Sequence, residues 1–393
     1  MNKAIFAAAA TAAALALAPP AANAAGPVRI GFVATMTGNG AIVGRDIRDG
    51  FEFGLAELGG KLGGLDTEIT YADDAENPNT GRQVVDKLIE VNKVQLITGF
   101  SNSAVLLATA RPILHAGVFL VGANAGPSQL AGKECNENYF STSWQNDASS
   151  EAMGQYVTSL GVKDAYLMAP NFPAGKDKLA GFKRYFKGKI DAEVYTPFGQ
   201  SDYASALAEL RRAKPTAMYF FYYGSMGINF IKQLDQSGLK KDIQVFSEMA
   251  GIDQEMLPAV GKAAVGMKGA VFWSSTLDNP QNKAFVEGFE KKYHRIPSPY
   301  TAQGYDTAKL LDAALRESHG LDNKDAFRAA MMKADFKSVR GYFAFGKNHF
   351  PIEDWYLATP EEIDGKLRDK ILSTIFTHHG DAYVSQCPMA KQG

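Results

Sequence analysis

The sequence predicts an α/β protein made of two doubly wound parallel-sheet lobes. Segments with strand and helix patterns alternate along most of the chain, as expected when helices cover both faces of parallel sheets. The strand segments are short, continuous apolar runs such as VFLVGA (118–123), which is typical of parallel strands buried on both faces. The chain has 393 residues, more than the roughly 250 that a single domain usually reaches.

The first series of elements begins at residue 28. We expect strands at 28–35, 67–74, 94–100 and 118–123, and helices at 45–60, 79–92 and about 104–115. In the first of these helices Ile47, Phe51 and Leu55 recur at helical spacing and mark one apolar side. The chain is expected to switch lobes near 141–147, where this series ends.

A second series with the same rhythm follows. We expect helices at 147–161, 175–188, 203–214 and 228–238, and strands at 164–170, 191–198, 216–224, 243–248 and 268–276. A second switch between lobes is expected near 274–280. The tail from Gly341 contains shorter strand-like pieces and a closing segment with Cys387.

The N-terminus has the features of a secretory signal peptide. Lys3 gives a short basic start, an apolar stretch runs from 4 to 18, and Ala22-Asn23-Ala24 matches an A-x-A cleavage pattern. A membrane anchor is the alternative, but about 15 apolar residues are short for a span that needs roughly 20. We therefore predict export, with residues 1–24 removed near Ala24.

Charge and cysteine content further limit the class of protein and its partners. Lys and Arg total 41 against 42 for Asp and Glu, and no basic run indicates binding to nucleic acid. The two cysteines, Cys135 and Cys387, form an even pair in an exported chain, which favours a disulfide. Two free buried thiols are the alternative that the sequence leaves open.

Several kinds of catalytic or cofactor site lack their patterns. Thr37-Gly38-Asn39-Gly40 fits neither phosphate-binding glycine motif and is expected to be a tight turn. His378-His379 shows no metal-ligand spacing, and no G-x-S-x-G nucleophile elbow is present. We expect no metal, no cofactor and no enzymatic activity.

Two adjacent strand ends form the strongest candidate for a binding site. Residues 99–103 lie at the end of the third expected strand (94–100), and residues 124–126 follow the fourth (118–123). Ligands of open parallel sheets bind beyond the carboxyl ends of strands, and free helix amides there attract anions. Ser103 and these amides can hold a carboxylate. Alternatively, Ser101 or Ser103 serves only as a helix N-cap.

At this point the sequence resembles a known family. The resemblance rests on segments in a fixed order: IGFVATMTG (30–38), ITYADDAENP (69–78), VQLITGFSNSAVLLATARPIL (94–114), VGANAGPSQL (121–130), YFSTSWQNDASSEAMGQYV (139–157), GQSDYASALAELRRAKPTAMYF (199–220) and PSPYTAQGYDTAKLLDAAL (297–315). Together they resemble the type I periplasmic binding proteins, specifically the leucine/isoleucine/valine-binding family of ABC importers.

The resemblance implies two lobes joined by three hinge strands, closing on a ligand. It places the hinge strands near 141–143, 273–276 and 341–345. Lobe 1 would comprise 25–142 plus 275–342, and lobe 2 would comprise 143–274 plus 343–393. The protein would be a monomeric periplasmic receptor that binds a small carboxylate and docks on a membrane permease. A ligand-sensing receptor domain and an exported enzyme are the alternatives.

The resemblance also implies the ligand-binding residues. Ser103, with Asn102 beside it, corresponds to the position that receives the carboxylate. The remaining positions are Val43 in the N-terminal loop, Asn124, Ala125 and Gly126 after the next strand, and Phe172, Tyr222, Tyr223, Ser225 and Glu248 from the second lobe.

The ligand itself depends on Glu248. An amino acid would need a buried carboxylate for its ammonium group, and Glu248 corresponds most nearly to that position. However, NAGPS (124–128) and PNFPAGKD (170–177) depart from the amino-acid pattern and resemble family members that take up aromatic carboxylates. For an aromatic acid, Glu248 would face solvent or pair with a protein cation. We favour the aromatic acid, with a branched-chain or other apolar amino acid as the alternative.

Overall fold

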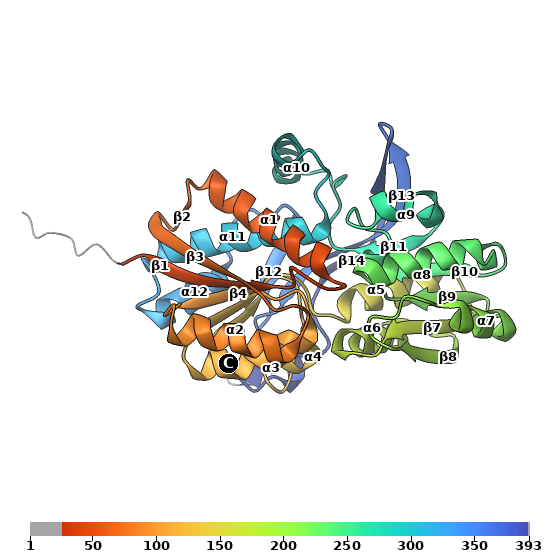
Figure 1. Cartoon of the computed structure of the whole chain (residues 1–393), viewed down its shortest axis with the longest axis horizontal. Coiled ribbons are helices and arrows are strands. Elements are labelled where there is room, and N and C mark those ends of the chain that lie inside the picture. Colours follow the sequence, from red (N-terminus) through yellow and green to blue (C-terminus); the bar gives the residue numbers. More distant parts are fainter. Residues whose placement is uncertain (1–25, 392–393) are drawn as a thin grey trace, which may run out of the picture.

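The computed structural model describes residues 26–391. These residues form two lobes, each built around its own β-sheet, arranged along the longest axis of the molecule (Figure 1). The predicted α/β fold class with two lobes is therefore confirmed. The predicted signal peptide and its cleavage point near Ala24 lie outside the described residues.

The first lobe contains a six-stranded sheet in the order β2-β3-β1-β4-β5-β6. Its strands are β1 (Val28–Ala34), β2 (Lys61–Leu62), β3 (Leu65–Asp73), β4 (Leu96–Gly99), β5 (Phe119–Gly122) and β6 (Tyr139–Ser141). All neighbouring strands are parallel except β2 and β3. Neighbouring residues of β1 belong to different cores, Phe32 to one and Val33 to the other, because side chains alternate across a strand.

Helices cover both faces of this sheet. They are α1 (Ala41–Glu57), α2 (Pro78–Glu90), α3 (Ser103–His115), α4 (Ser128–Ala131), α10 (Pro280–Tyr293), α11 (Pro299–Ser318) and α12 (Lys324–Lys333). The helix α1 packs against α11 on the face of Phe32, whereas α2 packs against α3 on the face of Val33. The sequence predicted α1 to α3 to within a few residues of these bounds.

The second lobe contains an eight-stranded sheet in the order β12-β13-β11-β10-β9-β7-β8, with β14 paired to β13. Its strands are β7 (Asp164–Pro170), β8 (Lys189–Thr196), β9 (Ala217–Phe220), β10 (Gln244–Glu248), β11 (Lys268–Val271), β12 (Phe343–Phe345), β13 (Pro351–Ile363) and β14 (Lys366–His379). The strands β7 to β11 are parallel to one another, as predicted, whereas the pairs β11–β13, β12–β13 and β13–β14 are antiparallel.

The helices of the second lobe also lie on both faces of its sheet. They are α5 (Ala148–Ser159), α6 (Pro173–Tyr185), α7 (Ala204–Ala213), α8 (Gly224–Gln236) and α9 (Leu257–Val260), with short 3-10 turns at Leu239–Lys241, Met249–Gly251, Gly261–Ala264, Val384–Gln386 and Met389–Lys391. Tyr219 of β9 stacks on Phe182 of α6, while the next residue, Phe220, contacts Phe230 of α8. The two helices therefore lie on opposite faces. No helix among residues 26–391 has the length and hydrophobicity needed to cross a bilayer.

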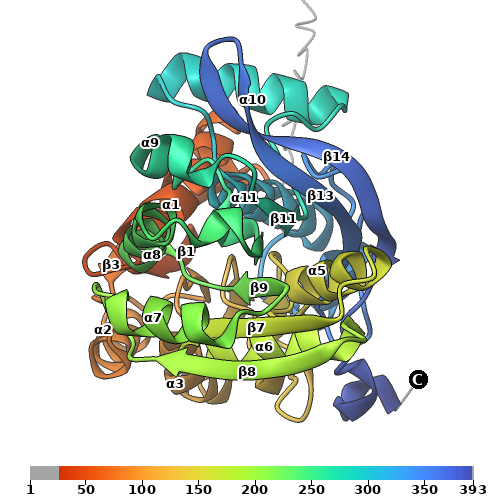
Figure 2. The same ribbon diagram turned by 90° about the vertical axis from the view of Figure 1, so that its right-hand side faces the viewer.

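The C-terminal region differs from the prediction of short strand-like pieces. The strands β13 and β14 form a long hairpin, visible in blue in Figure 2. Its turn residues Asp364 and Gly365 both have positive φ, as two-residue hairpin turns prefer. Buried and half-buried residues alternate along the start of β13 instead of forming an apolar run. A search for apolar runs therefore underestimates the length of this strand.

The chain passes between the lobes after β6, after β11 and before β12. The guanidinium of Arg340 lies where these passages meet. It donates hydrogen bonds of 2.9 Å to the carbonyl oxygens of Thr142 and Ser143, and it lies 4.7 Å from the ring centre of Phe272. Arg340, which precedes β12, thus contacts the passages after β6 and after β11. The predicted lobe boundaries remain predictions.

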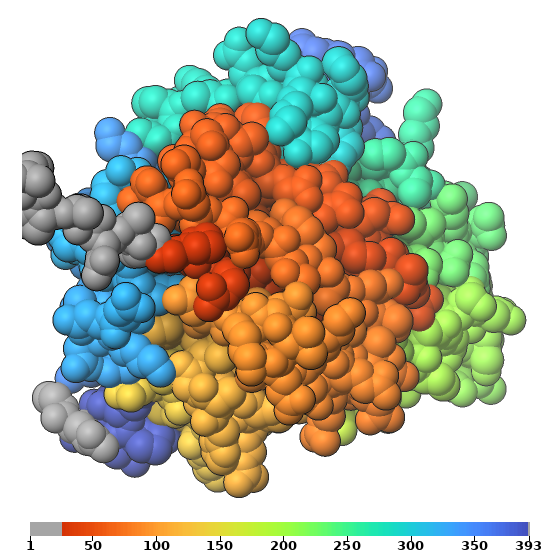
Figure 3. Space-filling view, turned by 60° about the vertical axis from the view of Figure 1, so that its left-hand side comes forward, coloured from red at the N-terminus to blue at the C-terminus, as the bar shows by residue number. Residues whose placement is uncertain are grey.

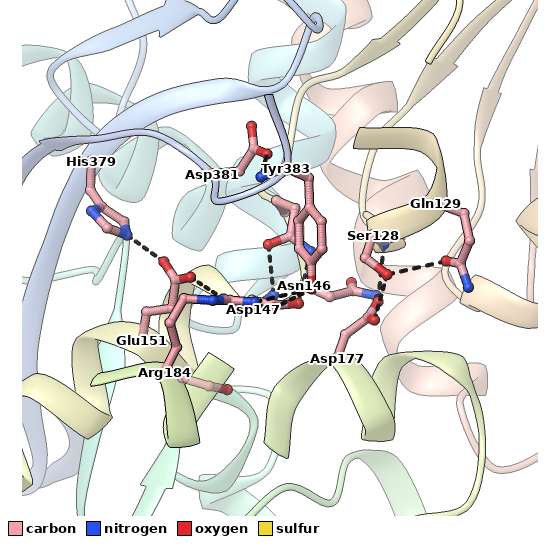
Figure 4. Close-up of polar contacts among 12 residues, drawn as sticks. Ser128, Gln129, Asn146, Asp147, Glu151, Asp177, Arg184, His379, Asp381 and Tyr383 are labelled. Atoms are coloured by element: carbon pink, nitrogen blue, oxygen red, sulfur yellow. Dashed lines mark hydrogen bonds and ion pairs between the residues drawn. The ribbon is translucent and has the colours of Figure 1, made fainter. Parts of the chain in front are cut away.

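The last described residues contact both lobes. Cys387 is joined by a disulfide to Cys135, which follows α4 in the first lobe, with the two Cα atoms 5.6 Å apart. On the other side, the Tyr383 hydroxyl donates to Asp147 at 2.8 Å and accepts from Arg184 of α6 at 3.2 Å (Figure 4). The C-terminal segment therefore ties the first lobe to the helices α5 and α6 of the second.

Candidate functional site

A cavity lies between the lobes where the carboxyl ends of the strands of both sheets meet. The space between its atoms, including the part open to solvent, is about 420 Å³. Its lining residues come from both lobes: Val43, Ser101, Ser103, Asn124, Ala125, Trp144, Asn146, Phe172, Ala174, Lys178, Phe221, Tyr223, Glu248, Met249 and Tyr300. The lining combines apolar and aromatic side chains with a few polar groups, which is the composition typical of small-molecule sites.

One end of the cavity is formed by the turn between β4 and α3. Asn102 caps α3, because its side-chain oxygen accepts from the backbone N–H groups of Ala104 and Val105. Ser101 instead accepts from the N–H of Thr35 at 3.1 Å. The alternative that Ser101 or Ser103 is the N-cap is therefore wrong. Ser103 is the first helical residue, and its N–H has no acceptor within the helix.

The hydroxyl of Ser103 is oriented by its neighbours. Its oxygen accepts a hydrogen bond of 3.2 Å from the side-chain amide of Asn146. Asn146 in turn donates to Asp177 at 3.0 Å, and Asp177 accepts from both the N–H and the hydroxyl of Ser128 (Figure 4). Because the Ser103 oxygen already accepts, its own proton remains available to a ligand. A donor pair at a helix N-terminus is suited to a carboxylate.

Aromatic side chains form the walls of the cavity. Phe172, Phe221 and Tyr223 lie with ring centres 5.8 to 6.2 Å apart. Two further lining rings, those of Trp144 and Tyr300, lie with their centres 6.4 Å apart. These rings offer apolar surface and edge or face contacts to an aromatic ligand.

Direct contacts between the lobes close the cavity. The Tyr223 hydroxyl donates to Glu76 at 2.9 Å and accepts from Asn102 at 3.3 Å. Burial raises the pKa of Tyr223 well above its ordinary value, so it stays protonated. Nearby, the Ser225 hydroxyl donates to Asn39 at 2.9 Å. Figure 3 shows this junction, where the red segment of the first lobe meets the green segment of the second.

The lining of the cavity also contains a buried ion pair. Lys178 Nζ lies 2.9 Å from Glu248 Oε2, and the two side chains are 3% and 1% exposed. Lys178 also donates to Ser149 Oγ at 2.6 Å, while Ser149 donates to Glu248 at 3.1 Å. The other oxygen of Glu248 accepts from the N–H of Ala250. Glu248 therefore pairs with a protein cation, which is one of the two arrangements expected for an aromatic-acid ligand.

The turn after β5 contributes fewer residues to the cavity lining than the sequence suggested. Asn124 and Ala125 line the cavity together with Val43. The Asn124 amide nitrogen donates to Ser101 O at 3.0 Å, whereas its buried Oδ1 has no partner among the described residues. That oxygen can accept from a ligand hydroxyl. Gly126 lies behind the lining, and a Cβ there would come within 2.1 Å of the Trp144 carbonyl oxygen.

The structure divides the predicted ligand-binding residues into two groups. Those that line the cavity are Val43, Ser103, Asn124, Ala125, Phe172, Tyr223 and Glu248. The remainder, which do not line it, are Asn102, Gly126, Tyr222 and Ser225. Asn102 caps a helix and Ser225 joins the lobes. Tyr222 contacts Tyr203 and Phe230 in the core of the second lobe.

The misplacement of Tyr222 has a simple reason. The chain is extended as it leaves β9, so residues two apart point to the same side. Phe221 and Tyr223 therefore face the cavity, and Tyr222 faces the core. The lining residues that the sequence did not predict are Ser101, Trp144, Asn146, Ala174, Lys178, Phe221, Met249 and Tyr300. Alternation would have found Phe221, whereas Trp144 and Asn146 follow the first passage between the lobes and Tyr300 lies at the start of α11, far along the chain.

Comparison with known proteins identifies the family. The family model described as periplasmic binding protein matches residues 27–366. The chain belongs to the periplasmic binding proteins. The predicted membership in the type I solute-binding group is confirmed by a curated relative, the Leu/Ile/Val-binding protein homolog 6 of Brucella melitensis. It is 26% identical over 272 residues, covering 67% of this chain and 69% of its own.

Solved periplasmic binding proteins share the fold over nearly the whole chain. A solute-binding protein of an ABC transporter from R. palustris, in complex with benzoate, is 30% identical with a TM-score of 0.87, covering 92% of this chain and 100% of its own. A second, from Rhodopseudomonas palustris BisB5 in complex with 3,4-dihydroxy benzoic acid, is 28% identical with a TM-score of 0.86, covering 91% and 99%.

The Ser103 hydroxyl should contribute measurably to ligand affinity. A hydrogen bond to a charged group contributes about 1.5–3 kcal/mol, so Ser103→Ala should weaken carboxylate binding by roughly 10- to 150-fold. Isothermal titration calorimetry measures this change. Ser159→Ala is the matched control, because that hydroxyl bonds within its own helix to Tyr156 O. Equal dissociation constants for Ser103→Ala and the wild type would exclude this hydroxyl as an anchor.

Proposed function

We propose that this periplasmic binding protein is the receptor of an ABC importer for an aromatic carboxylate. One observation carries the proposal. The inter-lobe cavity has the N-terminus of α3, with its free donors at Ser103, and aromatic side chains from both lobes in one lining. A carboxylate on a small ring satisfies both features at once. The benzoate and dihydroxybenzoate bound by the two R. palustris proteins support the same ligand class.

In this proposal the carboxylate accepts from the N–H and hydroxyl of Ser103, and the ring lies among the aromatic side chains. Burial of a Phe-sized ring contributes about 1.5–3 kcal/mol. The free Asn124 Oδ1 offers an acceptor to a hydroxyl on the ligand, which favours hydroxylated rings over unsubstituted ones. A ligand that contacts both lobes stabilises the closed arrangement, and the hinge at Arg340 allows the lobes to separate without it.

The receptor role implies a place and partners. Ligand capture requires no catalytic group, so we infer that the protein is not an enzyme. We also infer that it works as a monomer in the periplasm, after removal of residues 1–24, and that its closed form docks on a membrane permease. A ligand-sensing receptor domain is the alternative role, and an exported enzyme is disfavoured by the family.

A thermal-shift screen tests the ligand class. The panel is benzoate, 4-hydroxybenzoate, 3,4-dihydroxybenzoate, leucine, isoleucine and phenylalanine. A ligand at 1,000 times its dissociation constant adds about 4.1 kcal/mol to the stability of the folded state. We expect the aromatic acids to raise the melting temperature by several degrees and the amino acids to leave it unchanged. A rise with leucine or isoleucine alone would contradict the proposal.

A further inference from the structure

The buried pair Lys178–Glu248 balances the charge of the cavity before any ligand enters. Among the described residues that line the cavity, Glu248 carries the only carboxylate and Lys178 the only permanent cation. The pair is almost completely buried, and both Glu248 oxygens are hydrogen-bonded within the protein. A ligand ammonium that entered this cavity would find no lining carboxylate free to pair with it.

The position of Lys178 is fixed by close packing of two helices. A Cβ on Gly181 of α6 would lie 2.5 Å from the carbonyl oxygen of Asp147 at the start of α5, so only glycine permits this approach. The approach brings Lys178 of α6 to Ser149 of α5. The ammonium group also lies 5.2 Å from the ring centre of Trp144 and 5.4 Å from that of Phe221, both of which line the cavity. Lys178 is therefore held at the cavity wall by contacts on several sides.

We propose that Lys178 supplies, from within the protein, the ammonium group that an α-amino acid would bring, and so determines specificity against amino acids. The inference rests on the proposed carboxylate-binding function and deepens it. An amino acid would have to bury its ammonium unpaired or compete with Lys178 for Glu248, and an unpaired buried charge is very costly. A carboxylate without an amino group needs no such partner.

The test compares ligand pairs that differ only in the amino group. These are L-phenylalanine with 3-phenylpropanoate and L-leucine with 4-methylpentanoate, titrated calorimetrically. For the wild type we expect the amino acid to bind at least about 100-fold more weakly than its des-amino partner. Lys178→Met keeps the length of the stem, removes the charge and frees Glu248. This variant should gain amino-acid binding. The ratio between the dissociation constants of the amino acid and its des-amino partner should fall by about 100-fold or more.

The double variant Lys178→Met/Glu248→Gln is the matched control. It contains neither charge, so it should bind the des-amino acids within about tenfold of the wild type and reject the amino acids again. This result separates the proposed role from one in which Lys178 itself holds the ligand carboxylate, because the double variant would then lose the des-amino acids.

The inference is overturned if Lys178→Met prefers 4-methylpentanoate over leucine by the same factor as the wild type. It is also overturned, without any variant, if the wild type binds leucine as tightly as 4-methylpentanoate. The proposed function fails in a different way, when the wild type binds no carboxylate of either pair and none of the benzoates. The two failures are therefore distinguishable.

Discussion

Arg340→Met should reduce the stability of the protein by about 3–5 kcal/mol, because it breaks a buried ion-pair network. Arg340 lies 3.0 Å from both Asp306 of α11 and Glu353 of β13, and all three side chains are at most 3% exposed. Burial raises the pKa of Glu353 to about 7, and Arg340 opposes that rise. Without the guanidinium, two buried carboxylates lose their cation, although Asp306 keeps its hydrogen bonds from Ser338 and Val339.

Urea unfolding followed by circular dichroism measures this loss as a lower transition midpoint. Arg316→Met is the matched control, since Arg316 pairs with Asp312 on the surface with its side chain 61% exposed. Exposed pairs contribute about 0–1 kcal/mol, so the control should unfold close to the wild type. Equal midpoints for the two variants would show that Arg340 does not hold the hinge together.

Loss of the disulfide should cost about 2–5 kcal/mol. Cys135 and Cys387 are 252 residues apart, and a cross-link that closes so long a loop strongly restricts the unfolded chain. The folded C-terminal segment keeps its other contacts, including that of Tyr383 with Asp147. The expected effect is therefore a lower unfolding midpoint of Cys135→Ser/Cys387→Ser, with little change in ligand affinity.

A reductant provides the control for this prediction. Dithiothreitol should lower the midpoint of the wild type and leave that of the double serine variant unchanged. Mass spectrometry after alkylation without reduction should find no labelled thiol in the wild type. Two labelled cysteines, or identical midpoints for both proteins in both conditions, would contradict a stabilising disulfide.

The sequence predicted most of the parallel strands and the helices between them, because the pattern there is local. Continuous apolar runs identified β4 and β5, and helical spacing identified α1. The hairpin β13–β14 was missed because its residues alternate between buried and half-buried. The Asp364-Gly365 pair was the available signal, since Asp-Gly is typical of two-residue hairpin turns.

The candidate site was predicted only in part. Ser103 and Asn124 follow strand ends directly, so position along the chain was enough to find them. Lys178 lies in the middle of α6 and reaches the cavity only because that helix packs closely on α5. Arg340 looks like an ordinary charged residue in the sequence, yet it is buried where three passages of the chain meet. Such roles depend on tertiary packing, which no local pattern encodes.

The central claim is that the closed cavity holds an aromatic carboxylate and that Glu248 serves Lys178 instead of a ligand ammonium. Calorimetry of the wild type and Glu248→Gln with 4-hydroxybenzoate, phenylalanine and leucine tests it most directly. We predict that the wild type binds 4-hydroxybenzoate tightly and that Glu248→Gln changes its dissociation constant by less than about tenfold. Tenfold corresponds to about 1.4 kcal/mol of binding free energy, and a smaller loss is expected because no charged group of this ligand contacts Glu248. Tight leucine binding that Glu248→Gln abolishes would contradict the claim.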